Sequence, residues 1–352
     1  MVYTSDSETT LNRTTPVDRS VQLPSVSVVI PCLNEERHIG SVLASLARQY
    51  APEIYEIILV DGMSTDRTRD VVEEFVKCNS AIRTTIIDNP KRDIPTALNL
   101  GINAAHGDVI VRMDAHSTPS PGYVRRCASL LAENRAAVVG MPWFIQPGED
   151  SLMAKAIALA VAHPFGIGDA QYRLKPESAQ FVDTVPFGAF RKVLWTSLGG
   201  FNEKLLTNED YDFNYRVRQA GEKVLLDVEE HCAYSARPTL SALARQYQRY
   251  GFWKAQMLKK QIRSLRWRHL VAPVFVLSLL FSFITGFVWS PAWWILLLIV
   301  VAYALVSLIS AIMIAGRAKT FRVVFLLPLI FFVIHFSWGA SFLTGMIIPR
   351  RL

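Results

Sequence analysis

The last third of the chain contains no acidic residue. From His231 to Leu352 there are 14 Lys or Arg and no Asp or Glu, whereas residues 1–230 hold 23 basic and 30 acidic side chains. The net charge of +7 therefore belongs to the C-terminal part. Nine of the 14 positive residues lie between Arg237 and Arg268. Nucleic-acid binding is one interpretation of this basic stretch, but its position before an apolar run favours a membrane flank.

Charged residues are also missing from three long apolar runs. Each run is long enough to cross a hydrocarbon core of about 30 Å as a helix. The sequence therefore predicts a membrane domain over residues 270–352 with about three transmembrane helices. The three runs are residues 270–289, 292–315 and 323–348.

The charge pattern leaves the topology of the last run open. Lys and Arg before the first run favour a cytoplasmic flank. Three full spans would then leave Arg350 and Arg351 outside, against the same rule. The last run is thus a span that overrides the charge bias, a re-entrant segment, or a segment bent at Pro328.

Several familiar signatures are missing as well. Residues 1–24 have no apolar core of the kind that a signal peptide needs, and we expect a flexible polar tail. The four cysteines form no C-x-x-C pair, which indicates reduced thiols in a cytosolic domain. No G-x-G-x-x-G follows the first predicted strand, and G-x-x-x-x-G-K-[ST] does not occur. A dinucleotide fold or a P-loop nucleotidase is therefore disfavoured.

The front part of the sequence alternates between predicted strands and helices. Compact apolar strands are followed by segments with apolar residues at i, i+3, i+4 and i+7. This alternation predicts an α/β domain with a mostly parallel sheet covered by helices on both faces. The clear strands are residues 26–31, 56–61, 83–89 and 108–114, and the weaker or later ones are residues 136–144, 181–190 and 222–227.

Carboxylates cluster where three of these strands end. Glu35 follows the first strand, Asp61 ends the second and Asp114 ends the fourth. The carboxyl ends of parallel strands meet at one edge of a sheet, and ligands bind there. One acidic strand end is an ordinary loop feature, but three at the same edge predict a binding site.

Five motifs in order resemble the inverting family 2 glycosyltransferases of the GT-A fold. They are "VSVVIPCLNEERHIGSVLASL", "EIILVDGMSTDRTRDVV", "MDAH", "GGFNE" and "NEDYDFNYRVRQAG". The likeness covers residues 25–255 and is greatest to the succinoglycan-biosynthesis glucosyltransferase type, in which D-A-H replaces the usual D-x-D. It implies a Rossmann-like nucleotide-sugar domain over residues 25–236.

The resemblance also implies a set of donor-binding residues. Asp61 and Glu35 would accept hydrogen bonds from the ribose and the base, while basic side chains after the third strand would face the diphosphate. Alternatives remain: Asp61 as a turn residue, Asp66 as a helix-start residue, and Lys91 with Arg92 as a solvated loop. The expected nucleotide-sugar-binding residues are Pro31, Asn34, Glu35, Asp61, Ser64, Asp66, Arg92 and Asp114.

Asp114 and His116 are candidate metal ligands. At i and i+2 on a strand end they would point the same way and could hold one ion beside the donor phosphates. Mn²⁺ or Mg²⁺ would serve, and the imidazole favours Mn²⁺. In the alternative, His116 contacts phosphate or acceptor without touching metal.

Asp210 is the candidate general base. The "NED" motif, residues 208–210, stands where the family has its catalytic E-D pair, so the resemblance assigns the base to Asp210 with Glu209 beside it. The base would take the proton of the attacking acceptor hydroxyl. The alternative is a helix N-terminus stabilised by acids.

The basic segment 237–269 contains a further candidate element. Gln246, Arg249 and Tyr250 resemble the Q-x-x-R-W element of membrane polysaccharide synthases, which implies contacts to diphosphate and acceptor sugar. An interfacial amphipathic helix is the structural alternative. Gly188 resembles a residue of the acceptor-side loop, with core packing as its alternative.

Together these features predict an inverting, metal-dependent hexosyltransferase at the inner (plasma) membrane with its catalytic domain in the cytoplasm. It would move a hexose, glucose from UDP-glucose by resemblance, onto a lipid-linked oligosaccharide in extracellular or cell-envelope polysaccharide biosynthesis. The alternatives are a polyprenyl-phosphate sugar transferase and a non-catalytic sugar-nucleotide-binding scaffold. The NED motif together with the Q-x-x-R-Y element argues against the polyprenyl-phosphate sugar transferase, whose acceptor phosphate needs no base. The complete set of motif carboxylates argues against the non-catalytic scaffold.

Overall fold

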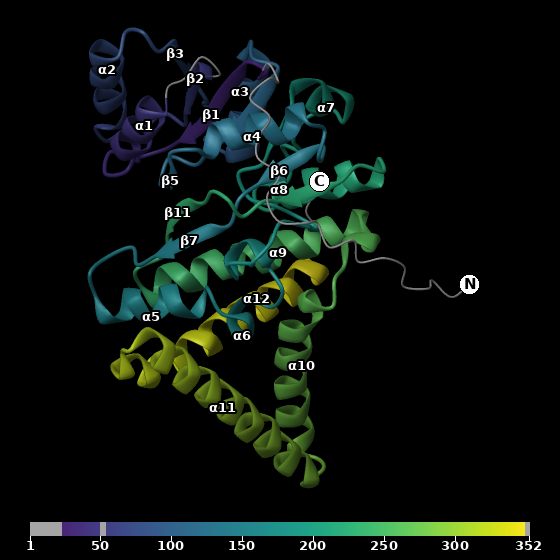
Figure 1. The fold of residues 1–352 in the computed structure, drawn as a ribbon. Coiled ribbons are helices and arrows are strands. Elements are labelled where there is room, and N and C mark those ends of the chain that lie inside the picture. Colours follow the sequence, from purple (N-terminus) through teal and green to yellow (C-terminus); the bar gives the residue numbers. More distant parts are fainter. Residues whose placement is uncertain (1–22, 50–53, 349–352) are drawn as a thin grey trace.

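The computed structural model describes residues 23–49 and 54–348. Most of the predicted tail, and the basic pair Arg350 and Arg351, lie outside the described residues. Figure 1 shows an α/β body above a set of long C-terminal helices. The predicted fold class is confirmed.

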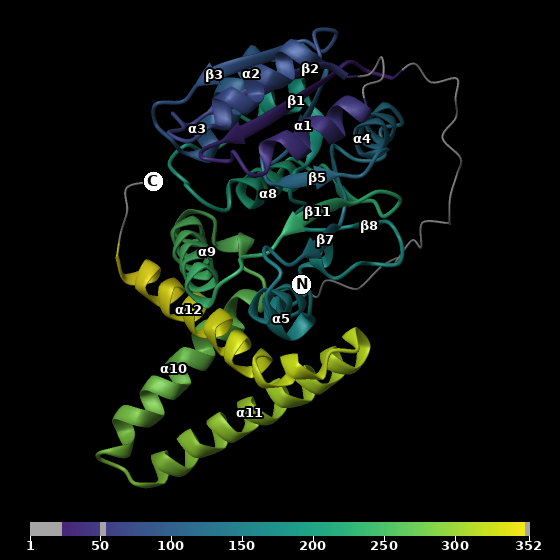
Figure 2. The same ribbon diagram turned by 90° about the vertical axis from the view of Figure 1, so that its left-hand side faces the viewer.

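The first half of the body is the predicted alternation of parallel strands and helices. The central strands are buried on both faces and the edge strand Thr84–Asp88 only in part. Helices cover both faces: α1 and α2 pack on one face and α3 on the other (Figure 2). In space the strands run β3-β2-β1-β4. The bounds are β1 (Val26–Cys32), α1 (Ile39–Arg48), β2 (Ile54–Asp61), α2 (Thr68–Cys78), β3 (Thr84–Asp88), α3 (Ile94–Ala104) and β4 (Val109–Arg112).

The sheet continues with the short strands that the sequence predicts only weakly. β9 is antiparallel to both of its neighbours and β8 is antiparallel to β10, so this end of the eight-stranded sheet is mixed. From β4 the order is β9 (Ala189–Arg191), β6 (Val138–Gly140), β10 (Val224–Leu226) and β8 (Gln180–Phe181). Further helices around the sheet are α4 (Tyr123–Ala132), α7 (Lys192–Ser197) and α8 (Glu209–Gln219).

A second, three-stranded sheet lies between the large sheet and the C-terminal helices (Figure 1). Its order is β5 (Ser117–Pro119), β11 (Cys232–Ser235) and β7 (Trp143–Gln146). The chain between β7 and β8 forms α5 (Leu152–Ala160), α6 (Pro164–Ile167) and a 3-10 helix (Gln171–Arg173). These short helices bring loop residues next to the membrane helices.

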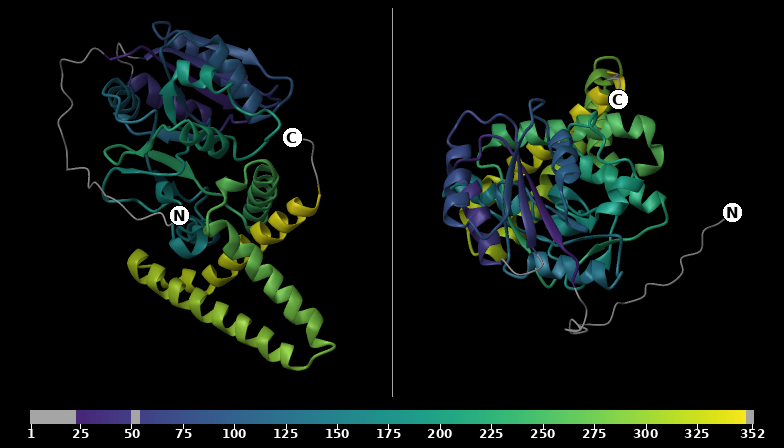
Figure 3. Two further views of the ribbon diagram at one scale, coloured as in Figure 1. Left: turned by 90° about the vertical axis from the view of Figure 1, so that its right-hand side faces the viewer. Right: turned by 90° about the horizontal axis from the view of Figure 1, so that it is seen from above.

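Three C-terminal helices are long and apolar enough to cross a membrane. α10 and α11 form a hairpin that points away from the α/β body, and α12 crosses beneath α9 (Figure 3). Pro328 lies in the first turn of α12, after the 3-10 helix Phe321–Phe325. The helices are α9 (Leu240–Lys260), α10 (Arg268–Gly286), α11 (Pro291–Ala318) and α12 (Leu327–Ile347), with a 3-10 helix Ile262–Ser264 between α9 and α10.

Small residues let α9 and α12 approach closely. A Cβ atom on Gly251 of α9 would lie 2.2 Å from the carbonyl oxygen of Trp338, and one on Gly345 of α12 would lie 2.8 Å from that of Phe252. Small residues at helix contacts allow backbones to touch in this way. The membrane helices are thereby attached to the segment that carries the Q-x-x-R-Y element.

Candidate active site

The loop after β1 is joined to the loop after β4. Nδ1 of His116 lies 3.0 Å from Glu35 Oε1, and His38 Nδ1 lies 3.1 Å from Oε2. Burial alone would raise the pKa of Glu35, but its bonds with the two imidazoles outweigh that effect and lower the pKa. Burial would likewise lower the pKa of His116, yet the Glu35 carboxylate raises it. Two of the predicted site residues are therefore joined by a hydrogen bond, which becomes an ion pair when His116 is protonated.

Asp61 is buried at the end of β2 and its carboxylate is already engaged. Ser64 donates its backbone N–H and its hydroxyl to Asp61, the latter at 2.5 Å, and Arg69 Nε lies 2.6 Å from Oδ2. These are the bonds of a turn residue neutralised by an arginine. The structure thus supports the turn role, and any donor contact would be made alongside it.

Asn34 and Asp66 tie the loops after β1 and β2 together. Asn34 Oδ1 accepts from the backbone N–H of Thr65 at 2.9 Å. Asp66 accepts from the N–H and the hydroxyl of Thr68 and from the N–H of Glu36. The alternative role of Asp66 at the start of a helix accounts for these bonds.

The two basic residues of the loop after β3 have different surroundings. Lys91 pairs with Glu203 at 2.7 Å, so its charge is used within the protein. Arg92 is exposed and has a left-handed backbone with φ of 59°. Pro31 lies buried inside β1. Both basic side chains are exposed, but only Arg92 is without an ion pair among the described residues, which leaves its charge available to a ligand.

A buried arginine joins the acids of two predicted motifs. Arg112, at the end of β4, contacts Asp210 Oδ2 through Nη1, and its Nη2 lies 3.1 Å from Asp114 Oδ1 and 3.0 Å from Glu209 Oε1. The side chain of Arg112 is 3% exposed. The NED motif and the DAH motif, about a hundred residues apart in sequence, therefore meet at one guanidinium.

Burial and charge together determine the state of Asp210. Burial raises the pKa of Asp210 to about 7; the Arg112 guanidinium opposes the rise, while Glu209 and Asp114 add to it. One guanidinium faces three carboxylates, so the cluster has an excess of negative charge. A carboxyl with this pKa suits proton transfer near neutral pH.

The cluster fits a divalent cation that takes few protein ligands. β4 ends at Arg112, so Asp114 and His116 lie in the turn beyond it, and the expected strand alternation does not orient them. Among the described residues no group of three His, Cys, Asp or Glu side chains is arranged to hold a metal ion. Mg²⁺ and Mn²⁺ can be bound by one or two carboxylates together with substrate phosphates. The bond from His116 to Glu35 is the kind that orients metal-binding imidazoles.

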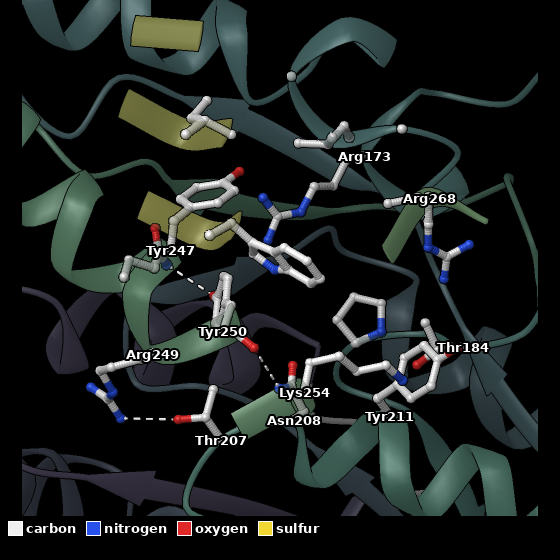
Figure 4. Close-up of a pocket in the computed structure, with 18 of the residues that line it drawn as sticks. Arg173, Thr184, Thr207, Asn208, Tyr211, Tyr247, Arg249, Tyr250, Lys254 and Arg268 are labelled. Atoms are coloured by element: carbon white, nitrogen blue, oxygen red, sulfur yellow. Dashed lines mark hydrogen bonds between the residues drawn. The ribbon is translucent and has the colours of Figure 1, made fainter. Parts of the chain in front are cut away.

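The Q-x-x-R-Y element of α9 lies against the loop that precedes Asp210. Gln246 Nε2 donates to the hydroxyl of Tyr250 at 3.0 Å, and Arg249 Nη2 donates to Thr207 Oγ1 at 3.4 Å. Asn208 Nδ2 donates to the carbonyl of Tyr250 at 3.2 Å (Figure 4). The element is thus packed onto the candidate base motif, with its three side chains at the wall of a cavity.

That cavity, of about 920 Å³, connects the carboxylates to the membrane helices. At one end lie the acids of the Arg112 cluster. At the other lie side chains of α10, α11 and α12. Residues from both ends and the middle are Asp114, Glu209, Asp210, Tyr250, Arg173, Lys254, His269, Phe275, Tyr303 and His335.

Gly188 does not lie where the acceptor-side role implied by the resemblance would place it. It does not line the cavity, and a Cβ there would lie 2.9 Å from Val138 Cγ1 and 3.4 Å from Val185 Cγ2. The core-packing alternative therefore applies, because β6 leaves no room for a side chain. The neighbouring Pro186 and Phe187 line the cavity instead.

Arg112, Arg173 and Lys254 were not among the predicted site residues. Arg112 carried a signal, since a charged residue in an apolar strand is rarely buried without partners. Arg173 lies in an irregular segment with no pattern, and Lys254 is one of nine cations in the basic stretch. Nothing in the sequence separated Arg173 and Lys254 from solvated charges.

Comparison with known proteins shows to which family the chain belongs. The sequence profile described as "Glycosyl transferase family 2" matches residues 27–198. The succinoglycan biosynthesis protein ExoA of Rhizobium meliloti is 30% identical over 247 residues, which cover 68% of this chain and 73% of that protein. This chain belongs to glycosyltransferase family 2. The predicted family is confirmed.

Two more comparisons extend over nearly the whole of this family 2 glycosyltransferase. A Methanococcus voltae protein named dolichyl N-acetyl-alpha-D-glucosaminyl phosphate 3-beta-D-2,3-diacetamido-2,3-dideoxy-beta-D-glucuronosyltransferase is 26% identical over 327 residues, 92% of this chain and 97% of that protein. The mannosyltransferase PcManGT from Pyrobaculum calidifontis, solved with GDP-Man and Mn²⁺, aligns with a TM-score of 0.59 and 19% identity over 93% of this chain and 88% of that one. The fold is the GT-A fold.

Proposed function

We propose that this glycosyltransferase is an inverting, membrane-anchored hexosyltransferase that extends a lipid-linked saccharide. The observation that carries the proposal is one continuous cavity that has Asp114 and Asp210 at one end and membrane-helix side chains at the other. A soluble acceptor would need no such connection. A lipid-linked acceptor does, because its sugar must reach the carboxylates while its lipid stays in the bilayer.

The donor would be a nucleotide-sugar bound at the loops after β1, β2 and β4. The resemblance of the motifs to the succinoglycan-biosynthesis glucosyltransferase type implies glucose, with UDP-glucose as the donor. The likeness to a succinoglycan biosynthesis protein favours an envelope or extracellular polysaccharide as the product. The name of the Methanococcus voltae relative, which specifies a dolichyl-phosphate-linked sugar, supports a lipid-linked acceptor.

Asp210 would act as the general base. Its carboxylate would take the proton from the acceptor hydroxyl as that oxygen attacks the anomeric carbon and the nucleoside diphosphate leaves from the opposite side. Attack from the side opposite the leaving group inverts the anomeric configuration. Arg112 would keep Asp210 in place and favour its charged form, and Tyr250 would offer an aromatic face to the acceptor sugar.

A divalent cation, Mn²⁺ or Mg²⁺, would neutralise the donor diphosphate as it leaves. Asp114 would be its protein ligand, with His116 as a second. The relative solved with GDP-Man and Mn²⁺ supports a metal of this kind.

The basic flank of α10 favours an orientation with the α/β domain in the cytoplasm and the helices in the plasma membrane. Nine positive residues between Arg237 and Arg268 and the absence of acids there agree with this orientation.

The proposal is tested by incubating the purified full chain with a panel of nucleotide-sugars and Mn²⁺ and measuring release of nucleoside diphosphate. We expect hydrolysis of one or a few donors, with UDP-glucose among them, and faster release when membrane lipid extract is added. A polyprenyl-phosphate sugar transferase would instead form a sugar phosphate lipid with polyprenyl phosphate alone. No turnover of any donor would contradict the proposal.

A further inference from the structure

The wall of the cavity contains a buried arginine with no acidic partner. Arg173 is 6% exposed, and no carboxylate lies within 4 Å of it among the residues that the structure describes. Its Nε atom has no hydrogen-bond partner within the same part of the chain. A buried charge left unpaired is costly, so natural proteins pair it or hold it for a ligand.

Aromatic rings hold this arginine in position without neutralising it. The guanidinium carbon lies 4.7 Å from the ring centroid of Trp143 and 5.5 Å from that of Tyr172. Figure 4 shows the side chain pointing toward Tyr247 and Tyr250. The indole Nε1 of Trp143 is also buried and lacks a partner among the described residues. The hydroxyl of Tyr247, which can donate as well as accept, is a third such group. All three groups can donate to an anion.

The other cations of the cavity make the contrast clear. Arg112 pairs with three carboxylates, and Arg268 pairs with Asp169 and Asp183. Arg237, Arg245 and Arg249 form no ion pair among the described residues either, but they are exposed to water. Lys254 is buried like Arg173: it is 3% exposed, and its Nζ lies 3.6 Å from the ring centroid of Tyr211 and 3.3 Å from the carbonyl oxygen of Ser264. Burial and the nearby Arg268 lower the pKa of Lys254 to about 6. An anion would restore its charged form.

The segment that carries Arg173 lies against the membrane helices. The carbonyl oxygen of Phe165 lies 2.8 Å from Nε2 of His335 on α12, and a Cβ on Gly168 would lie 3.1 Å from the Cβ of Arg268 at the start of α10. The cavity then continues along Phe275 of α10. Anion binding at Arg173 would therefore occur next to the helices rather than among the carboxylates that the donor metal requires.

We propose that Arg173 and Lys254 bind the phosphate or diphosphate of the lipid-linked acceptor, whose chain enters past α10 and α12. This inference rests on the proposed function. The acceptor sugar would extend from that phosphate toward Asp210, so the two cations would set the distance between lipid and reacting hydroxyl. The donor diphosphate is the other possible source of the same chemistry, and the test separates the two.

The experiment measures binding of farnesyl diphosphate and of UDP with Mn²⁺ to the purified full chain in detergent, by thermophoresis. Arg173→Met should weaken farnesyl diphosphate about tenfold or more, as expected for a lost charge-assisted hydrogen bond, and leave UDP within about twofold. Lys254→Met should act in the same direction. Arg125→Met, at an exposed position on α4, is the matched control and should change neither.

Three results would overturn the inference: unchanged farnesyl diphosphate affinity in Arg173→Met, an equal loss of UDP affinity, or a melting temperature of the unliganded variant well below that of the wild type. The last would mean a structural role, since removing an unpaired buried charge should not destabilise the protein. If the wild type hydrolyses nucleotide-sugars but does not bind farnesyl diphosphate, only this inference fails. If it neither binds UDP nor hydrolyses any donor, the proposed function fails with it.

Discussion

Replacing Arg112 should destabilise the protein more than replacing any surface arginine. Arg112 is 3% exposed and meets Asp114, Glu209 and Asp210, whose side chains are 17%, 8% and 23% exposed. Removing one member of a buried ion pair costs about 3–5 kcal/mol, because the partner charges stay behind. For a domain of about 200 residues, at roughly 2–4 °C per kcal/mol, this corresponds to a fall in melting temperature of roughly 6–20 °C.

The assay is thermal unfolding of the detergent-purified Arg112→Met variant, with Arg125→Met as the control. Three carboxylates without their guanidinium form a strongly negative cluster. Added Mn²⁺ should therefore recover part of the lost stability in Arg112→Met and have a smaller effect on the wild type. A shift of about 2 °C corresponds to roughly 1 kcal/mol or less in a chain of this size. An Arg112→Met variant that melts within about 2 °C of the wild type would therefore refute the reasoning.

Three further predictions concern the metal, the base and the helix contact. Asp114→Ala should raise the Mn²⁺ concentration needed for half-maximal donor hydrolysis, and an unaltered Mn²⁺ titration would remove Asp114 as a ligand. Burial raises the pKa of Asp210 to about 7, so the carboxylate that acts as base is depleted at lower pH and the rate of transfer should decline below about pH 7. With a base of ordinary carboxyl pKa, about 4, the rate would instead stay unchanged down to about pH 5. Gly251→Leu places a side chain against the Trp338 carbonyl and should lower both the melting temperature and the rate of transfer. Gly316→Leu, where nothing lies within 4 Å of the added carbon, should change neither. Equal behaviour of the two leucine variants would show that the α9–α12 contact is unimportant.

The first half of the fold was predictable because local pattern and tertiary role coincide there. β1, β2 and β4 are largely apolar strands covered on both faces, so a compact apolar run in the sequence is also a strand in the sheet, and β3 continues the same alternation at the sheet edge, where it is only partly buried. β8 and β9 have two and three residues and pair antiparallel with distant segments. Their existence depends on contacts that the sequence pattern does not express.

The site was predictable where motif and geometry agree. Asp210 was found through the resemblance of the NED motif to the family, and Asp114 through its place at a strand end and the DAH motif. The structure brings the two acids to one guanidinium. The strand argument for Asp114 and His116 did not apply, because β4 ends at Arg112 and a turn follows. Arg173 was missed because its isolation from acids is a property of the fold, which places it near Trp143, Tyr247 and Tyr250, all distant in sequence.

The central claim is that Asp210 is the base of a nucleotide-sugar transfer, and it can be tested with one variant. The measurement is single-turnover transfer by Asp210→Asn, with the donor that the wild type hydrolyses, beside donor binding by the same protein. General-base catalysis contributes roughly 10²–10⁴-fold, so transfer should fall by that factor while donor affinity stays within about twofold. Asp150→Asn, on an exposed carboxylate, is the control. Turnover close to that of the wild type would contradict the account.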